Sequence, residues 1–168
     1  TLENQAGFTM ATWQHRPESY GYVRARSQDP FKHPEIQPNY LAADTDQQVI
    51  LAAIKICRKL AQTEALKPFV VEETFPSVAC QNDNDLLNSA REIGQSIYHL
   101  MGTCRMGSRD DKTAVVDAEL RVHGIKNLRV IDASIMPTMV SANLNAAVMM
   151  IAEKGADMVL GKTAAKAH

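Results

Sequence analysis

The chain has 168 residues, of which 45% are hydrophobic and 22% are charged, and its formal net charge is −1. This length and composition indicate a globular protein with one hydrophobic core, or one core and a fraction of a second. Acidic and basic residues nearly balance, so we expect no binding of nucleic acid and no electrostatic attraction to anionic membranes.

The first forty residues predict a β hairpin and then an irregular segment. Residues 7–15 and 20–27 have aromatic and β-branched residues between turn-forming ones, which is typical of two strands joined at residues 16–19. Residues 29–40 contain Pro30, Pro34 and Pro38. Because proline fixes φ and lacks an N–H, this segment is predicted to be an extended loop without regular structure.

Two helices are predicted next, over residues 44–66 and 82–95. The first has Asp44, Thr45 or Asp46 as candidate N-caps, and the second has Asn82 or Asp83. Their predicted apolar faces are Val49, Ala53, Ile56, Cys57 and Leu60 in the first helix and Leu86, Leu87, Ala90 and Ile93 in the second. A short strand and a loop are expected between them, over residues 67–81.

The last third predicts a strand followed by a helix. "NLRVID", residues 127–132, has the pattern of a short buried strand after a turn at His123–Gly124. Asn143 or Asn145 opens a final helix. One face of that helix is mostly small and apolar, so close packing against it is expected; its members are Ala146, Ala147, Met150, Ile151 and Lys154.

The cysteines and histidines favour neither disulfides nor a metal site. Cys57, Cys80 and Cys104 are odd in number and far apart, which favours a reducing compartment. The spacing of Cys80, His99, Cys104 and His123 matches no familiar zinc motif. No metal is expected.

Two places carry residues suited to chemistry. His99 stands in "YHLMGTCRMG", and a histidine is the side chain that exchanges a proton most easily near neutral pH. The start of the final helix presents unpaired N–H groups and positive charge, with Asn143 and Asn145 beside it. From the residues alone, His99 is more simply explained as a structural residue, and the two asparagines as an N-cap and its solvated neighbour.

Three stretches follow one another along the chain. They are "RPESYGYVRARSQDPFKHPEIQPNYL", then "YHLMGTCRMG", then "VVDAELRVHGIKNLRVIDASIMPTMVSANLNAAVMMIAEKGADMV". Together they resemble the C-terminal part of the glucose-methanol-choline (GMC) family of flavin oxidoreductases, and most of all its choline dehydrogenase-like alcohol dehydrogenases. The resemblance runs from about residue 7 to residue 160.

The resemblance implies an α+β fold: an antiparallel sheet with packed helices, as in the GMC substrate domain, plus the C-terminal strand and helix that complete a FAD-binding domain. Residues 1–100 would form the substrate-binding domain, residues 101–160 the catalytic loop and returning flavin-domain segment, and residues 161–168 a flexible tail. The G-x-G-x-x-G motif that binds FAD in such enzymes is absent from this sequence. FAD would therefore be bound mainly by an N-terminal domain that is not part of this chain.

The family pattern also implies roles for single residues. His99 matches the catalytic base and Asn143 its partner. Asp132 and Ala133 match cofactor-binding positions at the ribityl or pyrophosphate side of the flavin, and Asn145 and Ala146 match cofactor-binding positions beside the flavin. The implied reaction is oxidation of a small primary alcohol, with choline as one candidate, to an aldehyde by hydride transfer to flavin.

Two other functions stay open at this point: a stand-alone, non-catalytic substrate-binding or interaction module, and an alcohol oxidase that uses oxygen. The expected partners are the alcohol, the missing FAD domain and a second copy of the chain, because an unpaired strand promotes association. The expected location is cytoplasmic, with peripheral attachment of the parent enzyme to the inner membrane left open.

Overall fold

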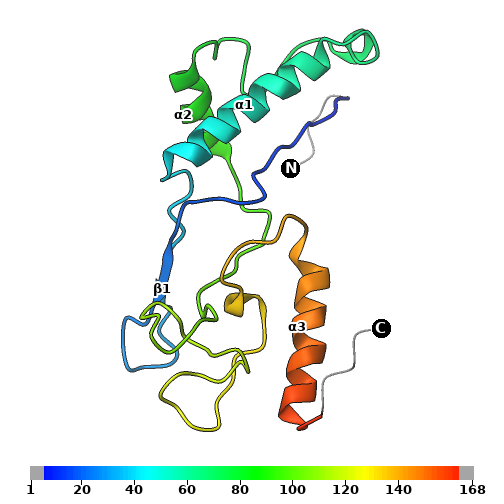
Figure 1. Ribbon diagram of the computed structural model, residues 1–168. Coiled ribbons are helices and arrows are strands. Elements are labelled where there is room, and N and C mark those ends of the chain that lie inside the picture. The colour runs from blue at the N-terminus through cyan, green and yellow to red at the C-terminus, as the bar shows by residue number, and fades with distance from the viewer. Residues whose placement is uncertain (1–5, 163–168) are drawn as a thin grey trace. The chain divides into compact units, whose positions relative to one another are not determined.

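The computed structural model describes residues 6–162 and has an α+β fold, as predicted (Figure 1). Its elements are β1 (Tyr22–Arg24), β2 (Glu35–Gln37), α1 (Asp44–Ala61), the 3₁₀ helix η1 (Lys67–Phe69), α2 (Asp83–Ile93), the 3₁₀ helix η2 (Ala133–Ile135) and α3 (Leu144–Val159).

The chain forms two compact units. Unit 1 comprises Thr1–Gly21 and Pro38–Gln95, and unit 2 comprises Tyr22–Gln37 and Ser96–His168. The predicted boundaries after residues 100 and 160 divide the chain by expected role, into a substrate-binding domain, a flavin-domain segment and a tail. This division stays a prediction. Most of the predicted tail, residues 163–168, lies outside the described residues.

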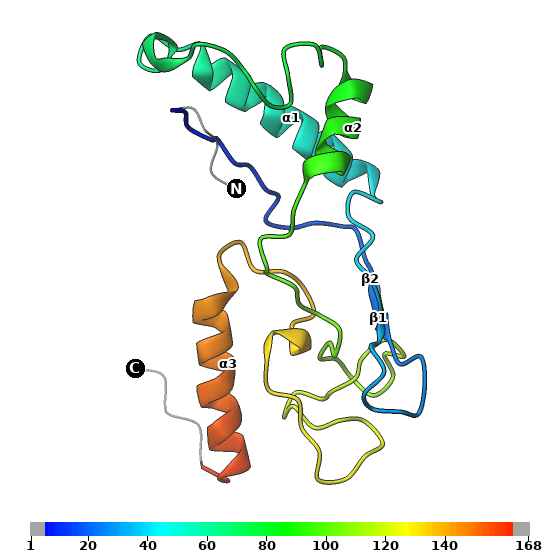
Figure 2. The same cartoon turned by 180° about the vertical axis from the view of Figure 1, so that it is seen from behind.

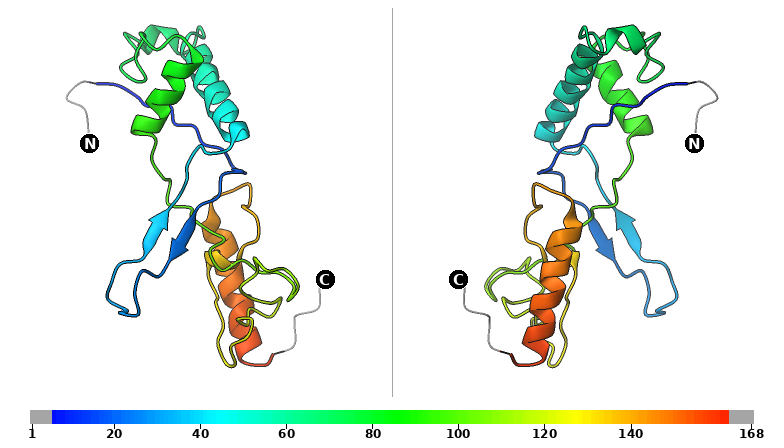
Figure 3. Two further views of the ribbon diagram at one scale, coloured as in Figure 1. Left: turned by 90° about the vertical axis from the view of Figure 1, so that its left-hand side faces the viewer. Right: turned by 90° about the vertical axis from the view of Figure 1, so that its right-hand side faces the viewer.

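Unit 1 is built on α1 and α2, which contact each other and lie side by side (Figure 3). Helix α2 begins as predicted, because the side chain of Asn82 accepts a hydrogen bond from the Asp85 N–H. Leu86 and Leu87 are buried on its inner face. Ile93, predicted for the same face, is exposed.

The predicted cap of α1 was wrong. The N-cap is Ala43, which makes no side-chain cap bond. Asp46 instead accepts hydrogen bonds from the N–H groups of Glu18 (2.9 Å) and Ser19 (2.8 Å) and from the Ser19 hydroxyl. Only 2% of Asp46 is exposed. The carboxylate therefore joins the segment before residue 22 to the first turn of α1, and we call these contacts the Asp46 clamp.

A second polar anchor replaces the strand predicted in residues 67–81. That segment consists of η1 and turns. The Arg58 guanidinium contacts both carboxylate oxygens of Glu73 at 2.8–3.1 Å and also donates to the carbonyls of Cys80 and Ser77. The backbone of this loop is thus held by a side chain of α1.

The hairpin of unit 2 differs from the predicted one (Figure 2). Strand β1 lies in the predicted 20–27 strand, but residues 7–15 form no strand. The partner is β2, antiparallel, with Val23 opposite Ile36. Residues 29–40 therefore do contain regular structure, since Pro34 and Pro38 flank the three paired residues and interrupt none of them.

The core of unit 2 lies between α3 and the loops of residues 101–140. Its buried members are Val116, Leu120, Ile135, Met136, Leu144 and Ile151. On α3 the buried residues are Leu144, Ile151 and Gly155. The predicted inner face was wrong in part, because Ala146, Met150 and Lys154 are exposed.

The predicted strand over residues 127–132 is also absent. Arg129 forms one isolated antiparallel bridge with Arg121, and two further backbone bonds join Val122 to Leu128 and Val130 to Leu120. Among the described residues, this segment has a bridge partner only on that side. A single short pairing is not enough to form a sheet.

In residues 6–162, no helix combines the length and the apolar character required to cross a bilayer.

Candidate functional site

The glycine-rich segment after His99 is attached to η2 by a backbone ladder. The N–H groups of Gly102, Cys104 and Met106 donate to the carbonyls of Ala133 (3.4 Å), Ser134 (2.9 Å) and Ile135 (2.8 Å). Gly102 has φ +85°, a conformation that glycine adopts without strain. The ladder fixes the direction in which the chain leaves His99.

His99 itself is half-buried and lies between two residues with positive φ, Tyr98 and Gly102. Tyr98 has φ +62°, in the left-handed region, and the residue is 88% exposed. Met101 packs against the unit 2 core. Within residues 6–162 the His99 ring makes no hydrogen bond or ion pair, so the geometry leaves both ring nitrogens available for a ligand.

Asp132 and Ala133 form the start of η2. The Asp132 carboxylate accepts the Ser134 N–H at 2.7 Å and thereby caps η2, and Asp132 is exposed. Ala133 is half-buried, and its carbonyl is the acceptor for Gly102. The two residues predicted beside a flavin therefore lie directly against the segment that carries the predicted base.

Asn143, Asn145 and Ala146 gather at the exposed N-terminus of α3. Asn143 is the N-cap residue, as predicted, but its side chain makes no cap bond. The Asn145 amide contacts the Met149 sulfur at 3.9 Å. The first turn contains no acidic residue, so the positive end of the helix is not neutralised within the turn. Asn143 therefore occupies the N-cap position without the side-chain hydrogen bond that a capping asparagine normally accepts.

His99 and Asn143 are not bonded to each other in the described part of the chain. They are linked indirectly, since Met101 and Leu144, two residues and one residue away, share the core of unit 2. Helix α3 also contacts η2. Backbone hydrogen bonds thus hold the start of η2 against residues 102–106. The N-terminus of α3 is held to the core of unit 2 by the packing of Leu144.

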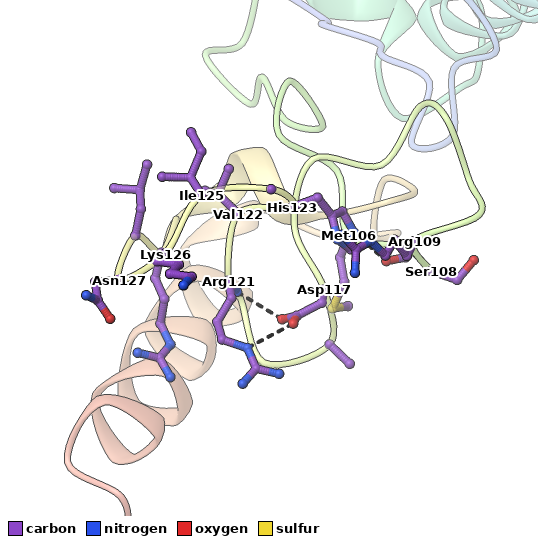
Figure 4. Close-up of a pocket in the computed structure, with 15 residues that line it drawn as sticks. Met106, Ser108, Arg109, Asp117, Arg121, Val122, His123, Ile125, Lys126 and Asn127 are labelled. Atoms are coloured by element: carbon purple, nitrogen blue, oxygen red, sulfur yellow. Dashed lines mark hydrogen bonds and ion pairs between the residues drawn. The ribbon is translucent and has the colours of Figure 1, made fainter.

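A hollow of unit 2 lies elsewhere. It has a volume of about 1000 Å³ and is lined by residues 106–109, 117–118 and 121–129, none of which is a predicted site residue (Figure 4). Arg121 points to Asp117 there, with its Nε 2.9 Å from Oδ2. Burial raises the pKa of Asp117, but the hydrogen bonds from Arg121 and from the Glu119 N–H, together with the Arg121 charge, lower it by more. This pair is a structural contact of a surface turn.

Sequence reasoning missed the Asp46 clamp, the Arg58 anchor and the packing of Gly155 on Ile131. No signal in the sequence separates Asp46 from the neighbouring Asp44. Within the described residues, no three histidine, cysteine, aspartate or glutamate side chains are close enough to hold a metal ion.

Comparison with known proteins shows the family. The C-terminal-domain model of the GMC oxidoreductases matches residues 17–152. Human mitochondrial choline dehydrogenase is 47% identical over 149 residues, which are 89% of this chain and 25% of that protein. The oxygen-dependent choline dehydrogenase of Escherichia coli is 45% identical over 158 residues, 94% of this chain and 28% of that protein.

A solved structure agrees with this relationship. A formate oxidase of Aspergillus oryzae, studied for the effect of a mutation on FAD modification, superposes with a TM-score of 0.77 at 34% identity. The match covers 86% of this chain and 25% of that one. The chain belongs to the GMC oxidoreductase family. It spans about a quarter of the length of the curated relatives it matches.

The residues of this chain fit the flavin end of FAD. Reduced flavin is anionic, and the N-terminus of α3 offers N–H groups and positive charge with no acidic side chain in its first turn. The amide of Asn143 has no intrahelical cap bond and can donate to a ligand. The sequence contains no G-x-G-x-x-G turn that could bind the dinucleotide end of FAD.

Proposed function

We propose that this chain is the C-terminal part of a FAD-dependent oxidoreductase that oxidises a primary alcohol to an aldehyde. The match of the GMC family model to residues 17–152 carries the proposal. Choline is the first substrate to test, because two of the relatives are named choline dehydrogenases. A separate N-terminal domain would hold most of the FAD.

A bound FAD would supply the acceptor for the hydride that leaves the alcohol carbon. His99 takes the hydroxyl proton, for which its ring has two nitrogens without partners among the described residues. Asn143 donates its amide hydrogen to the alcohol oxygen and holds it in place. The backbone ladder from Gly102 to Met106 keeps the His99 segment fixed while the proton moves.

The remaining predicted residues act on the cofactor. Asn145, Ala146 and the positive N-terminus of α3 would hold the flavin end of a bound FAD and stabilise negative charge there. We assign Asp132 and Ala133, where η2 begins, to the ribityl or pyrophosphate side of the cofactor.

The test is flavin reduction by alcohol in the longer enzyme that contains this chain, measured by rapid-mixing absorbance. His99→Ala should slow this step by about 10²–10⁴-fold. Asn143→Ala should slow it as well and also weaken alcohol binding. His33→Ala is the matched control, since His33 is exposed and lies in the β1–β2 connection. Unchanged reduction in His99→Ala would contradict the assignment.

One competing function within the family is favoured by a specific observation: relatives and structural neighbours include an oxygen-dependent dehydrogenase and an oxidase. Oxygen consumption during alcohol turnover would identify an oxidase, and turnover only with an added electron acceptor would identify a dehydrogenase.

The non-catalytic alternative is tested on the 168-residue chain itself. Mixing it with FAD and recording the flavin absorbance shows whether it forms a cofactor site alone. Sedimentation of the same sample tests the expected self-association. Fractionation of cells tests the proposed cytoplasmic location and any attachment to the inner membrane.

A further inference from the structure

Gly155 lies on the buried face of α3 directly against Ile131. A Cβ built on Gly155 would stand 2.3 Å from Cγ2 of Ile131, 3.0 Å from Cδ1 and 3.3 Å from Cγ1. Real Cβ atoms do not approach other carbon atoms as closely as 2.3 Å, so an alanine at this position requires Ile131 or α3 to shift.

The position matters because Ile131 directly precedes the residues of the proposed site. Asp132 follows it and caps η2. Ala133 follows next and accepts the Gly102 N–H, the first bond of the ladder to the His99 segment. On the other side of the contact, Gly155 belongs to the helix whose first residues follow Asn143.

We infer that the contact of Gly155 with Ile131 sets the separation between the two halves of the proposed site, so that Gly155 is a positioning residue. One half is the Asp132–Ala133 segment with the attached His99 segment, and the other half is the N-terminus of α3. This inference rests on the proposed function for its catalytic consequence, but not for its structural one.

The structural consequence can be measured on the chain without cofactor, by hydrogen exchange of single amides. Gly155→Ala should increase the exchange rates of the Gly102, Cys104 and Met106 amides by about tenfold or more, because their acceptors in η2 move with Ile131. Amides of α2, in unit 1, should keep their rates.

A compensating variant separates this effect from general destabilisation. Ile131→Ala removes Cγ2, Cδ1 and Cγ1, the three atoms that a Cβ at position 155 would approach, and so relieves the clash in Gly155→Ala. The double variant should recover the protection of the three amides. Ala156→Gly is the control on the same helix: Ala156 is exposed, so this change alters helix propensity without touching Ile131.

In the longer enzyme, Gly155→Ala should shift the flavin absorbance band and slow flavin reduction by about 10–100-fold, as expected for a displacement of about 1 Å, with recovery in the double variant. Unchanged amide exchange in Gly155→Ala, or no recovery on adding Ile131→Ala, would overturn the inference. If no alcohol reduces the wild-type flavin but the amide exchange behaves as stated, the proposed function fails and the positioning contact stands.

Discussion

The Asp46 clamp gives a quantitative prediction about unit 1. Its carboxylate accepts two N–H bonds and one hydroxyl bond while 2% exposed. A hydrogen bond to a charged group contributes about 1.5–3 kcal/mol, and the freed N–H of the exposed Glu18 can be satisfied by water. We therefore expect Asp46→Ala to lower the free energy of unfolding by about 2–4 kcal/mol.

The assay is urea unfolding followed by the fluorescence of Trp13, the single tryptophan, which stacks on His15 in the segment held by the clamp. With an m-value of about 2 kcal/mol/M, the midpoint should fall by about 1–2 M. Asp44→Ala is the matched control, since Asp44 is exposed in the same first turn and should cost no more than about 1 kcal/mol. If the chain with Asp46→Ala does not fold, Asp46→Asn keeps one acceptor and makes the comparison possible.

The pH dependence has a defined sign. Burial raises the pKa of Asp46, but the hydrogen bonds to its carboxylate from Glu18, Ser19 and Gln14 together lower it by more, so the folded-state pKa is below the ordinary value. A carboxyl group of this kind contributes stability above its unfolded pKa of about 3.9 and loses it as the pH falls through the folded value. The difference between wild type and Asp46→Ala should be largest near pH 7 and shrink below about pH 4. Equal midpoints for Asp46→Ala and Asp44→Ala at pH 7 would refute the reasoning.

Three further changes test the packing and the anchors. Arg58→Lys should cost about 1–2 kcal/mol in denaturant unfolding, because lysine cannot replace the forked contact with Glu73; the exposed Lys55–Asp83 pair is the control, and Lys55→Met should cost under about 0.5 kcal/mol. Equal effects would contradict this. Val116→Ala should cost about 1.5–3 kcal/mol by the same assay, since Val116 is fully buried, whereas Val159→Ala, at a 58% exposed position, should be nearly neutral. In Ser19→Ala the unfolding free energy should fall by about 1 kcal/mol, and by much less when Asp46 is already alanine, as a double-mutant cycle would show.

Much of the local structure follows from the sequence. Local features were predicted because they depend on hydrogen bonds and apolar spacing within a few residues. They are the cap at Asn82, the start of α3 after Asn143 and the approximate bounds of α1 and α3. The family resemblance came from ordered motifs, and the comparison with the GMC family model confirmed it. The roles of His99 and Asn143 rest on those motifs and stay predictions.

The tertiary structure decided what depends on partners distant in the chain. Strand β1 pairs with residues between prolines and not with the preceding segment, because pairing needs a neighbour and not only propensity. Asp46 binds Ser19, 27 residues earlier, although nothing nearby distinguishes it from Asp44. Gly155 has no side chain and so adds nothing to a hydrophobic pattern, yet the absence of that side chain is what lets α3 approach Ile131.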